Sequence, residues 1–289
     1  MINLEKQHQH FVPQFWIRGF ANHKNQIYSW DGKQISIVSA RKIMQMKWLY
    51  TLFGKHWVPT NVLEDALSKL ESQYAVLFKK FQNPSNNLTE NDRMELCSCL
   101  ALQACRHPDV MNRGRRLAEQ FGTLIAQVHT LGGEQNFITE AAKFGISQFD
   151  AGTIYWSLIT KTPDQLQEEL NELKGLSPQD LRLPLQEALR AESMLFDVFC
   201  SMDLTLLDAP PTKIFVLGDT PISQSGIGQG FSVPLSQSIA IKVVPANTIQ
   251  KILSRRLAII CEVDQINKEQ WENAAKIVIG PDPNILKTL

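Results

Sequence analysis

Three polar side chains recur at helical spacing inside a strongly aromatic stretch near the start of the sequence. In HFVPQFWIRGFA, residues 10–21, His10, Gln14 and Arg18 stand four positions apart. Pro13 favours the start of a short helix, on which Gln14 and Arg18 share a face that His10 approaches from the preceding turn. A histidine can move a proton, and an arginine can hold phosphate oxygens in forked hydrogen bonds. The competing interpretation is an ordinary surface stripe of an amphipathic helix.

A second polar group closes an otherwise uncharged helical segment. Gln103, Arg106 and His107 are spaced i, i+3 and i+4 near the end of LTENDRMELCSCLALQACRHP, which places them on one side of a helix. Such groups need partners beside buried surface, because an unsatisfied one costs about 1–3 kcal/mol or more. Glu64 and Glu71, seven positions apart on another helical segment, could provide carboxylates. The pattern predicts either part of a binding site or a buried Arg–Glu clamp between two helices.

A carboxylate also follows an apolar, strand-like run. Asp219 comes directly after IFVL, residues 214–217, and the end of a buried strand is one place where catalytic or metal-binding acids occur. The sequence Asp-Thr-Pro is equally good turn chemistry, in which the side chain caps a loop. For Asp219 taken alone, the turn is the favoured interpretation.

Taken together, these residues come from four separated segments and would suit an anionic substrate. The candidate catalytic residues are His10, Asp219 and Glu64, and the candidate substrate-binding residues are Gln14, Arg18, Gln103 and Arg106. The arginines would hold phosphate, His10 would transfer a proton, and an acid would act as a base or hold a divalent metal ion. The first hypothesis is therefore a hydrolase, such as a nuclease, that acts on a phosphodiester, a nucleotide or a nucleic acid. The alternative is a non-catalytic binding or regulatory module in which the same residues form an internal salt-bridge network.

Two further patterns argue against familiar sites. Cys97 and Cys99 point about 200° apart on a helix, so one zinc ion cannot readily take both, and they are interpreted as small core residues. The run SGIGQGF, residues 225–231, has alternating glycines. It lacks the lysine of a P-loop and is not followed by a helix start, so it predicts a flexible loop that could act as a lid.

The N-terminal half must position these groups on a hairpin and two long helices. NQIYSWDGKQISIVS, residues 25–39, predicts a hairpin turning at Asp31-Gly32. Residues 61–81 predict an amphipathic helix with an apolar stripe of Leu63, Leu67, Leu70, Tyr74, Leu77 and Phe81. Residues 88–108 predict a buried helix with a capping box of Thr89 and Asp92, and Asp109 could cap a further helix that runs to Gly132.

The rest of the chain is expected to be helical and then to change to strands. Weaker helices are expected at 134–143, 147–160 and 163–173, with Thr162-Pro163 and Ser177-Pro178 as helix starts, and a longer helix at 184–203. Residues 213–221 and 237–245 predict strands, and Asn267 a cap for a last helix through about Ile277. The predicted class is α+β, with a mainly helical middle, a β-hairpin near the N-terminus and short strands near the C-terminus. We expect one domain: an N-terminal helix and hairpin (1–55), a helical core (56–205) and a strand-containing part (206–289).

Composition excludes a global electrostatic attraction and indicates a compartment. The 289 residues are 44% hydrophobic, and 29 Lys and Arg balance 29 Asp and Glu, so no overall pull toward nucleic acid or an anionic membrane exists. No apolar run approaches the roughly 18 residues that span a bilayer, so no membrane partner is expected. Five cysteines without an apolar leader predict reduced thiols and a cytoplasmic protein.

The opening stretch resembles the signature of a bacterial family of unknown function, His-(Tyr/Phe)-Val-Pro-Gln-Phe-Tyr-Leu-x-x-Phe. Here it reads HFVPQFWIRGF, with Trp16 and Ile17 where the family has Tyr and Leu. Further matches follow in order: the paired Leu-Glu segment, LQACRHP, FVLGDTPI and VPLSQSIAI. Gly218 and Thr220 replace the family's Ser and Asn beside Asp219. The resemblance spans nearly the whole chain and implies no activity.

Overall fold

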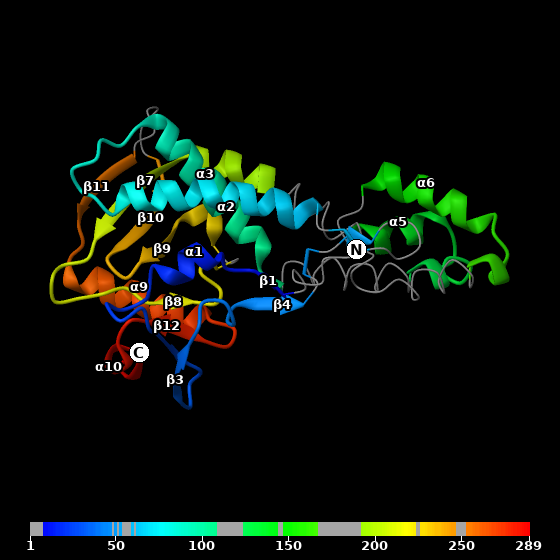
Figure 1. Cartoon of the computed structure of the whole chain (residues 1–289). Coiled ribbons are helices and arrows are strands. Elements are labelled where there is room, and N and C mark those ends of the chain that lie inside the picture. Colours follow the sequence, from blue (N-terminus) through cyan, green and yellow to red (C-terminus); the bar gives the residue numbers. More distant parts are fainter. Residues whose placement is uncertain are drawn as a thin grey trace.

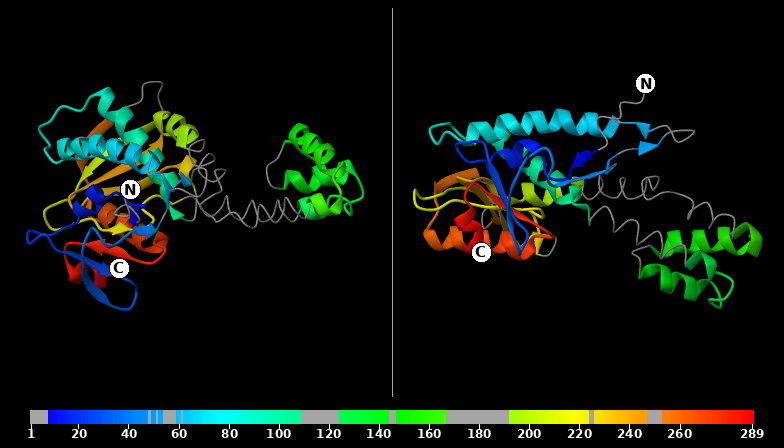
Figure 2. Two further views of the ribbon diagram at one scale, coloured as in Figure 1. Left: turned by 45° about the vertical axis from the view of Figure 1, so that its right-hand side comes forward. Right: turned by 60° about the horizontal axis from the view of Figure 1, so that its bottom comes forward.

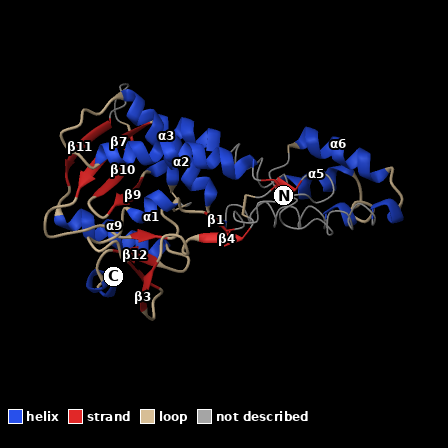
Figure 3. Cartoon of the chain, viewed as in Figure 1, coloured by secondary structure: helices blue, strands red, loops and turns tan. Residues whose placement is uncertain are grey.

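The computed structural model of the chain (Figure 1) describes residues 8–47, 49–50, 52–53, 59–60, 62–108, 124–143, 147–166, 192–223, 226–246 and 253–289. Figure 3 shows helices and strands in a mixed arrangement, and the expected α+β class is confirmed. None of the helices in these ranges combines the length and the apolar character needed to cross a membrane. The expectation of a single domain stays a prediction.

The largest sheet has the strand order β11-β7-β10-β9. Its strands are β7 (Met202–Asp208), β9 (Phe231–Ser236), β10 (Ile239–Pro245) and β11 (Leu253–Leu257). β10 pairs antiparallel with both β7 and β9, whereas β11 runs parallel to β7. Because side chains alternate between the two faces of a strand, Leu204 and Leu206 of β7 both enter the core, where each is 0% exposed.

The predicted hairpin forms, and strands from the other end of the chain extend it. β2 (Ile27–Trp30) and β3 (Ile35–Val38) flank the turn, where Gly32 has a φ of +86°. The Asp31 carboxylate accepts hydrogen bonds from two following amide groups at 2.8 Å each. β12 (Val278–Gly280) pairs with β2 on one side and β8 (Leu217–Gly218) on the other, which gives the order β3-β2-β12-β8. The sequence did not predict this long-range pairing.

Two small ribbons lie outside these sheets. β1 (His8–His10) pairs antiparallel with β4 (Gln45–Lys47), and β5 (Leu52–Phe53) with β6 (Pro59–Thr60). His10 therefore stands in a strand and not in the turn that its sequence neighbours suggested. As the strand ends, Val12 and Pro13 are buried and the chain enters α1.

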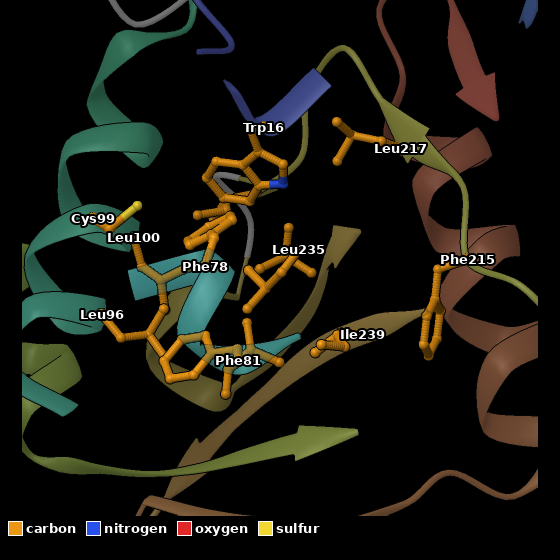
Figure 4. Packing of buried hydrophobic residues seen from close by; sticks show 14 of the residues in the cluster. Trp16, Phe78, Phe81, Leu96, Cys99, Leu100, Phe215, Leu217, Leu235 and Ile239 are labelled. Atoms are coloured by element: carbon orange, nitrogen blue, oxygen red, sulfur yellow. The ribbon is translucent and has the colours of Figure 1, made fainter. Parts of the chain in front are cut away.

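Three helices cover the large sheet and share the main hydrophobic core with its strands. They are α1 (Gln14–Arg18), α2 (Val62–Phe81) and α3 (Glu90–Arg106). Figure 4 shows Trp16, Phe78 and Phe81 packed between α3 and the strands. The capping box of α3 is confirmed, with Thr89 and Asp92 each accepting the other's backbone N–H. The uncharged part of α3 is buried as expected, and Leu96, Leu100 and Ala101 are each 0% exposed.

α5 (Glu134–Ala142) and α6 (Gln148–Ile159) confirm two of the weaker helices. They lie against each other in every view of Figures 1 and 2 and share a hydrophobic cluster of their own, centred on Phe137, Ala141, Ala151 and Leu158. Short helical segments occupy 124–126 and 163–166. The Asp109 cap, most of the helix that follows it and the Ser177-Pro178 helix start lie outside the described residues.

The apolar stripe of α2 and the helix expected at 184–203 are each only partly confirmed. Leu67, Tyr74, Leu77 and Phe81 are buried, but Leu70 is 38% exposed because the main core takes its α2 residues from Tyr74 onward. Residues 192–200 are helical, yet Met202 already begins β7, where pairing with β10 overrides local helix preference.

The predictions of a strand at 213–221 and of a cap at Asn267 were wrong in detail, and one contact explains both. α9 (Ile260–Asn273) begins seven residues earlier, and Asn267 lies in its middle, 5% exposed. The Asn267 side chain accepts from Val216 N–H at 3.0 Å and donates to the Ile214 carbonyl at 2.9 Å. Within residues 213–216, the Val216 N–H and the Ile214 carbonyl therefore form their hydrogen bonds with a helix side chain. Only Leu217–Gly218 pairs as a strand. α9 ends at Asn273, and the short helix α10 (Pro283–Lys287) follows β12.

The start of α9 contains an ion-pair cluster that should make stability pH dependent. Arg256 donates two hydrogen bonds of 2.7 Å to Glu262, and these contacts lower the pKa of Glu262 from 4.5 to about 2. A lowered folded-state pKa gives stability that is present above pH 4.5 and is lost as the pH falls toward 2. Allowing for partial exposure, we expect Glu262→Gln to lower the free energy of unfolding by about 1–2 kcal/mol at pH 6 and by roughly half of that or less at pH 3.

Urea denaturation of both proteins at the two pH values measures this difference. Glu272→Gln is the matched control, because Glu272 is on the same helix and pairs with Lys268 at 3.6 Å on the surface. A Glu262→Gln effect of equal size at pH 3 and pH 6 would contradict the assignment.

Candidate functional site

Arg106 is the centre of the polar cluster that the sequence singled out. It is 4% exposed at the last position of α3. Its Nη1 donates to Glu71 Oε1 at 2.7 Å, its Nη2 to the His10 carbonyl at 2.7 Å, and its Nε to the Tyr50 hydroxyl at 3.1 Å. Burial works to lower the pKa of Arg106, but its interactions with Tyr50 and Glu71 outweigh burial and raise it. All three guanidinium nitrogens are therefore engaged within the protein.

Local sequence explains why an arginine can stand here. α3 carries no charge between Leu96 and Cys105, so its last turns enter the interior. His107 then turns extended, with a ψ of 138°, and the chain leaves the helix. The guanidinium is thereby held between β1, α2 and the segment around Tyr50. Tyr50 also donates from its hydroxyl to the Arg106 carbonyl at 3.2 Å.

Two glutamines join the same cluster to β1. Gln103 donates from Nε2 to the Phe11 carbonyl at 3.0 Å. Its Oε1 is buried without a hydrogen-bond partner among the described residues. Gln9 is 0% exposed, and its Oε1 accepts the Tyr50 backbone N–H. The strand β1 is thus held by side chains from α3 and by its pairing with β4.

His10 lies at the edge of this cluster. Its Nε2 lies 3.0 Å from the Ala40 carbonyl, which can only accept, so Nε2 carries the proton. Burial lowers the pKa of His10 below 6.5, with the nearby charges of Arg106 and Arg18 acting in the same direction. The imidazole is therefore neutral near pH 7, and Nδ1 keeps a lone pair that can accept a proton.

Gln14 and Arg18 share one face of α1, as their spacing predicts. Arg18 is exposed, and its Nη2 donates to Gln14 Oε1 at 2.5 Å. Arg18 is also close enough to His10 to affect its pKa. The aromatic backing is present, since Trp16 and Phe20 are 0% exposed and the indole N–H donates to Pro234 at 2.8 Å. This row is a surface feature next to the buried cluster.

The two glutamates of α2 contribute differently. Glu71 forms the carboxylate end of the Arg–Glu clamp and is the more exposed partner, with a side chain that is 23% exposed against 4% for Arg106. Glu64, one of the candidate catalytic residues, lies two turns away, and its charge raises the pKa of Tyr50. Glu64 therefore acts electrostatically on the cluster.

Asp219 is 3% exposed and faces a different partner from the one its sequence suggested. Its Oδ1 accepts from Ala275 N–H at 2.7 Å, and its Oδ2 from the N–H groups of Lys276 and Ile277 at 3.0 and 3.3 Å. Burial raises the pKa of Asp219, while these hydrogen bonds and the charge of His107 oppose the rise. The carboxylate thus caps the loop between α9 and β12, where the sequence suggested its own turn.

His107 connects Asp219 to the rest of the cluster. The Thr220 hydroxyl and His107 Nε2 are 3.0 Å apart, and Phe11 packs edge-on against the His107 ring at a centroid distance of 5.6 Å. The structure therefore brings Arg106 and Gln103 onto the backbone carbonyls of His10 and Phe11, respectively. Asp219 is linked to this cluster through Thr220 and His107. Gln14 and Arg18 lie on the adjacent surface. Sequence reasoning missed Gln9 and Tyr50. Residues 5–10 are all polar, so nothing in the sequence around Gln9 marked it as buried.

A cavity of about 400 Å³ lies beyond Asp219, at the end of β8. Its polar lining comes from the chain after Thr220, from β9 and β10, and from α9: Ser223, Gln229, Ser232, Lys242, Glu269 and Asn273. The glycine-rich run borders it, with Ile227–Gln229 forming the short helix η3. The expectation of a lid stays a prediction.

Gly230 shapes this cavity, and its replacement should be costly. Its φ is +107°, and an added Cβ would stand 2.7 Å from the Val243 carbonyl oxygen. We expect Gly230→Ala to lower the free energy of unfolding by about 1–3 kcal/mol, because neither the backbone conformation nor the space suits a side chain. Thermal denaturation measures this, with Gly228→Ala as the control, since no atom lies within 4 Å of the Cβ added there. Equal losses in both variants would contradict the steric argument.

Metal ligands are not gathered here. Among the described residues, no group of three or more His, Cys, Asp or Glu side chains could hold an ion. The polar groups around Arg106 and Asp219 are hydrogen-bonded mostly to other groups of the protein.

Comparison with known proteins places the chain in a family without assigning an activity. No curated protein and no solved structure matches it. The profile of a family described as protein of unknown function (DUF4238) matches residues 8–284. Since this range covers most of the 289 residues, the chain belongs to that family.

Proposed function

We propose that this protein is a non-catalytic binding or regulatory module. The observation that supports this most directly is the engagement of all three Arg106 nitrogens, which donate to Glu71, Tyr50 and the His10 carbonyl. The Asp219 carboxylate is likewise occupied by three backbone amides. Groups held this way organise the protein and are not available to a substrate unless the network opens.

The ligand surface in this proposal is the face formed by His10, Gln14 and Arg18. Arg18 is exposed and uses one nitrogen for Gln14, so its other N–H groups can contact an anion. The buried cluster behind β1 and the aromatic core behind α1 hold this face rigid. A phosphate-containing small molecule suits the guanidinium and amide, and the five free cysteines support a cytoplasmic setting.

Binding of a nucleoside triphosphate to the Arg18 variant tests the ligand surface. We expect Arg18→Ala to weaken binding about tenfold, because a hydrogen bond to a charged group contributes about 1.5–3 kcal/mol. Isothermal titration at low salt measures this, and Lys268→Ala removes a comparable exposed cation from α9 as the control. If both variants bind as the unaltered protein does, the ligand lies elsewhere; if a single-stranded oligonucleotide binds far more tightly than the triphosphate, the partner is nucleic acid.

A second candidate is a phosphodiester hydrolase, and one observation favours it. His10 is neutral, with Nε2 protonated and Nδ1 open as a proton acceptor beside Arg18. That arrangement suits a general base acting on water next to a held phosphate. Hydrolysis of bis(p-nitrophenyl) phosphate with Mg²⁺ or Mn²⁺, lost in His10→Ala but kept in His129→Ala, would select the hydrolase over the module. Absence of hydrolysis in the unaltered protein, despite triphosphate binding, would reject it.

A further inference from the structure

Three sulfur atoms from two helices meet at one place away from the Arg106 cluster. Met94 and Cys97 are three positions apart on α3, so they share a face. Cys200, at the end of the helical residues 192–200, places its Sγ 3.8 Å from Met94 Sδ. The thiols of Cys97 and Cys200 are close enough for each to affect the pKa of the other. The sulfurs therefore form one connected group, although more than 100 positions separate Cys200 from the other two.

We propose that Met94, Cys97 and Cys200 bind a single Cu(I) ion. With metal–sulfur bonds of roughly 2.3 Å, as in zinc thiolates, three sulfurs in a plane around one ion lie about 4.0 Å apart. The separation of 3.8 Å between the Cys200 and Met94 sulfurs is close to this value. Trigonal coordination thus needs little movement of either side chain.

The ligand types select a soft ion. Thiolate and thioether sulfur favour Cu(I), whereas structural zinc is bound by four Cys or His ligands in a tetrahedron. Burial raises the pKa of Cys97 to about 12 and also raises that of Cys200. Binding must therefore displace two thiol protons, which an ion with a strong preference for sulfur can do. The reaction releases two protons and transfers no electrons.

A buried arginine lies beside the proposed site. Two thiolates and one Cu(I) carry a net charge of −1, and Arg93 places a positive charge next to them while it also pairs with the exposed carboxylate of Glu90 at 3.0 Å. Arg93 is 2% exposed, with its Nη1 3.9 Å from Met94 Sδ, and its charge opposes the rise in the pKa of both thiols. Its Nη2 holds the Cys200 carbonyl, whereas its buried Nε–H has no hydrogen-bond acceptor among the described residues. A thiolate sulfur would provide an acceptor for such a group.

The three sulfur-containing residues differ in their exposure to solvent. Met94 is 37% exposed and Cys200 is partly exposed, while Cys97 is 0% exposed beneath them. An ion can reach the two outer sulfurs first and then the inner one. Cys99, which points the other way on α3, lies near Arg106 and takes no part.

Competition for Cu(I) under reducing, oxygen-free conditions tests the proposal. The reduced protein is titrated into the Cu(I) complex of bathocuproine disulfonate, and the copper withdrawn is read from the loss of colour. We expect one equivalent to be withdrawn. Cys97→Ser and Cys200→Ser should each weaken the affinity more than about 100-fold and Met94→Leu about tenfold, because loss of a supporting group alone costs 10–100-fold. Cys261→Ser, which removes an exposed thiol from α9, should leave the affinity unchanged.

X-ray absorption of the loaded protein should report three sulfur neighbours at roughly 2.3 Å. Circular dichroism checks that each variant is folded. Cys200→Ser and Met94→Leu alter partly exposed positions, so they remain informative if Cys97→Ser unfolds. The proposal is overturned if the unaltered protein withdraws no copper, or if folded Cys200→Ser withdraws it as strongly as Cys261→Ser does. It is independent of the phosphate-binding surface.

Discussion

Replacing Arg106 by alanine should lower the free energy of unfolding by about 3–5 kcal/mol, because the change leaves the partners of a buried ion pair without compensation. Glu71 would keep a partly buried charge, and the His10 carbonyl and Tyr50 hydroxyl would each lose a donor. The loss should exceed that of an ordinary surface change several times over. Arg106→Lys should recover part of it, since one ammonium can reach Glu71 but cannot serve three acceptors.

Chemical denaturation with a circular dichroism readout measures this effect. Arg18→Ala is the matched control, because Arg18 is an exposed arginine that donates to Gln14, four positions away, and such pairs contribute about 0.5 kcal/mol or less. Comparable stability losses at positions 18 and 106 would mean that the buried cluster does not hold the segments together.

Asp219→Ala should be nearly as destabilising, with an expected loss of about 3 kcal/mol or more. Three backbone N–H groups between α9 and β12 would lose their acceptor, and each unsatisfied buried donor costs about 1–3 kcal/mol. The stability of Asp219→Asn should fall between that of the unaltered protein and that of Asp219→Ala. The amide keeps one acceptor oxygen but presents its NH₂ group to the remaining donors.

The same denaturation experiment applies, with hydrogen exchange at residues 275–277 as a local readout. Asp264→Ala is the control on α9, where a carboxylate that is 53% exposed pairs only with Lys213 among the described contacts. If Asp219→Ala proves as mild as Asp264→Ala while any hydrolysis of bis(p-nitrophenyl) phosphate disappears, Asp219 acts in chemistry and the structural interpretation is wrong.

The elements predicted best are those set by local pattern. α2, α3 and the hairpin at Asp31-Gly32 follow from periodicity, a capping box and a turn pair, each of which acts over a few residues. The partners of these elements could not be predicted in the same way. β12 separates β2 from β8, and β11 runs parallel to β7, because non-local packing and not sequence proximity decides sheet order.

The candidate site was predictable in its residue types more than in its geometry. Arg106 requires a carboxylate and Glu71 supplies it, as buried charge demands. Tyr50 could not be found, because nothing in the sequence near it marks it as a hydrogen-bond partner of Arg106, which is 56 residues later in the chain. Asp219 was placed at a strand end correctly, but its three amide donors come from a loop more than 50 residues away.

The position of β12 has a consequence for how the protein is made. Residues 278–280 form an inner strand between β2 and β8, so the sheet that begins with the N-terminal hairpin is incomplete until they are available. During synthesis the ribosome releases the hairpin some 240 residues before its neighbour, estimated from the spacing of the strands and a chain that emerges N-terminus first. Until then the edge of Ile27–Trp30 that later pairs with β12 is without its partner, and an unpaired strand edge can pair with another chain.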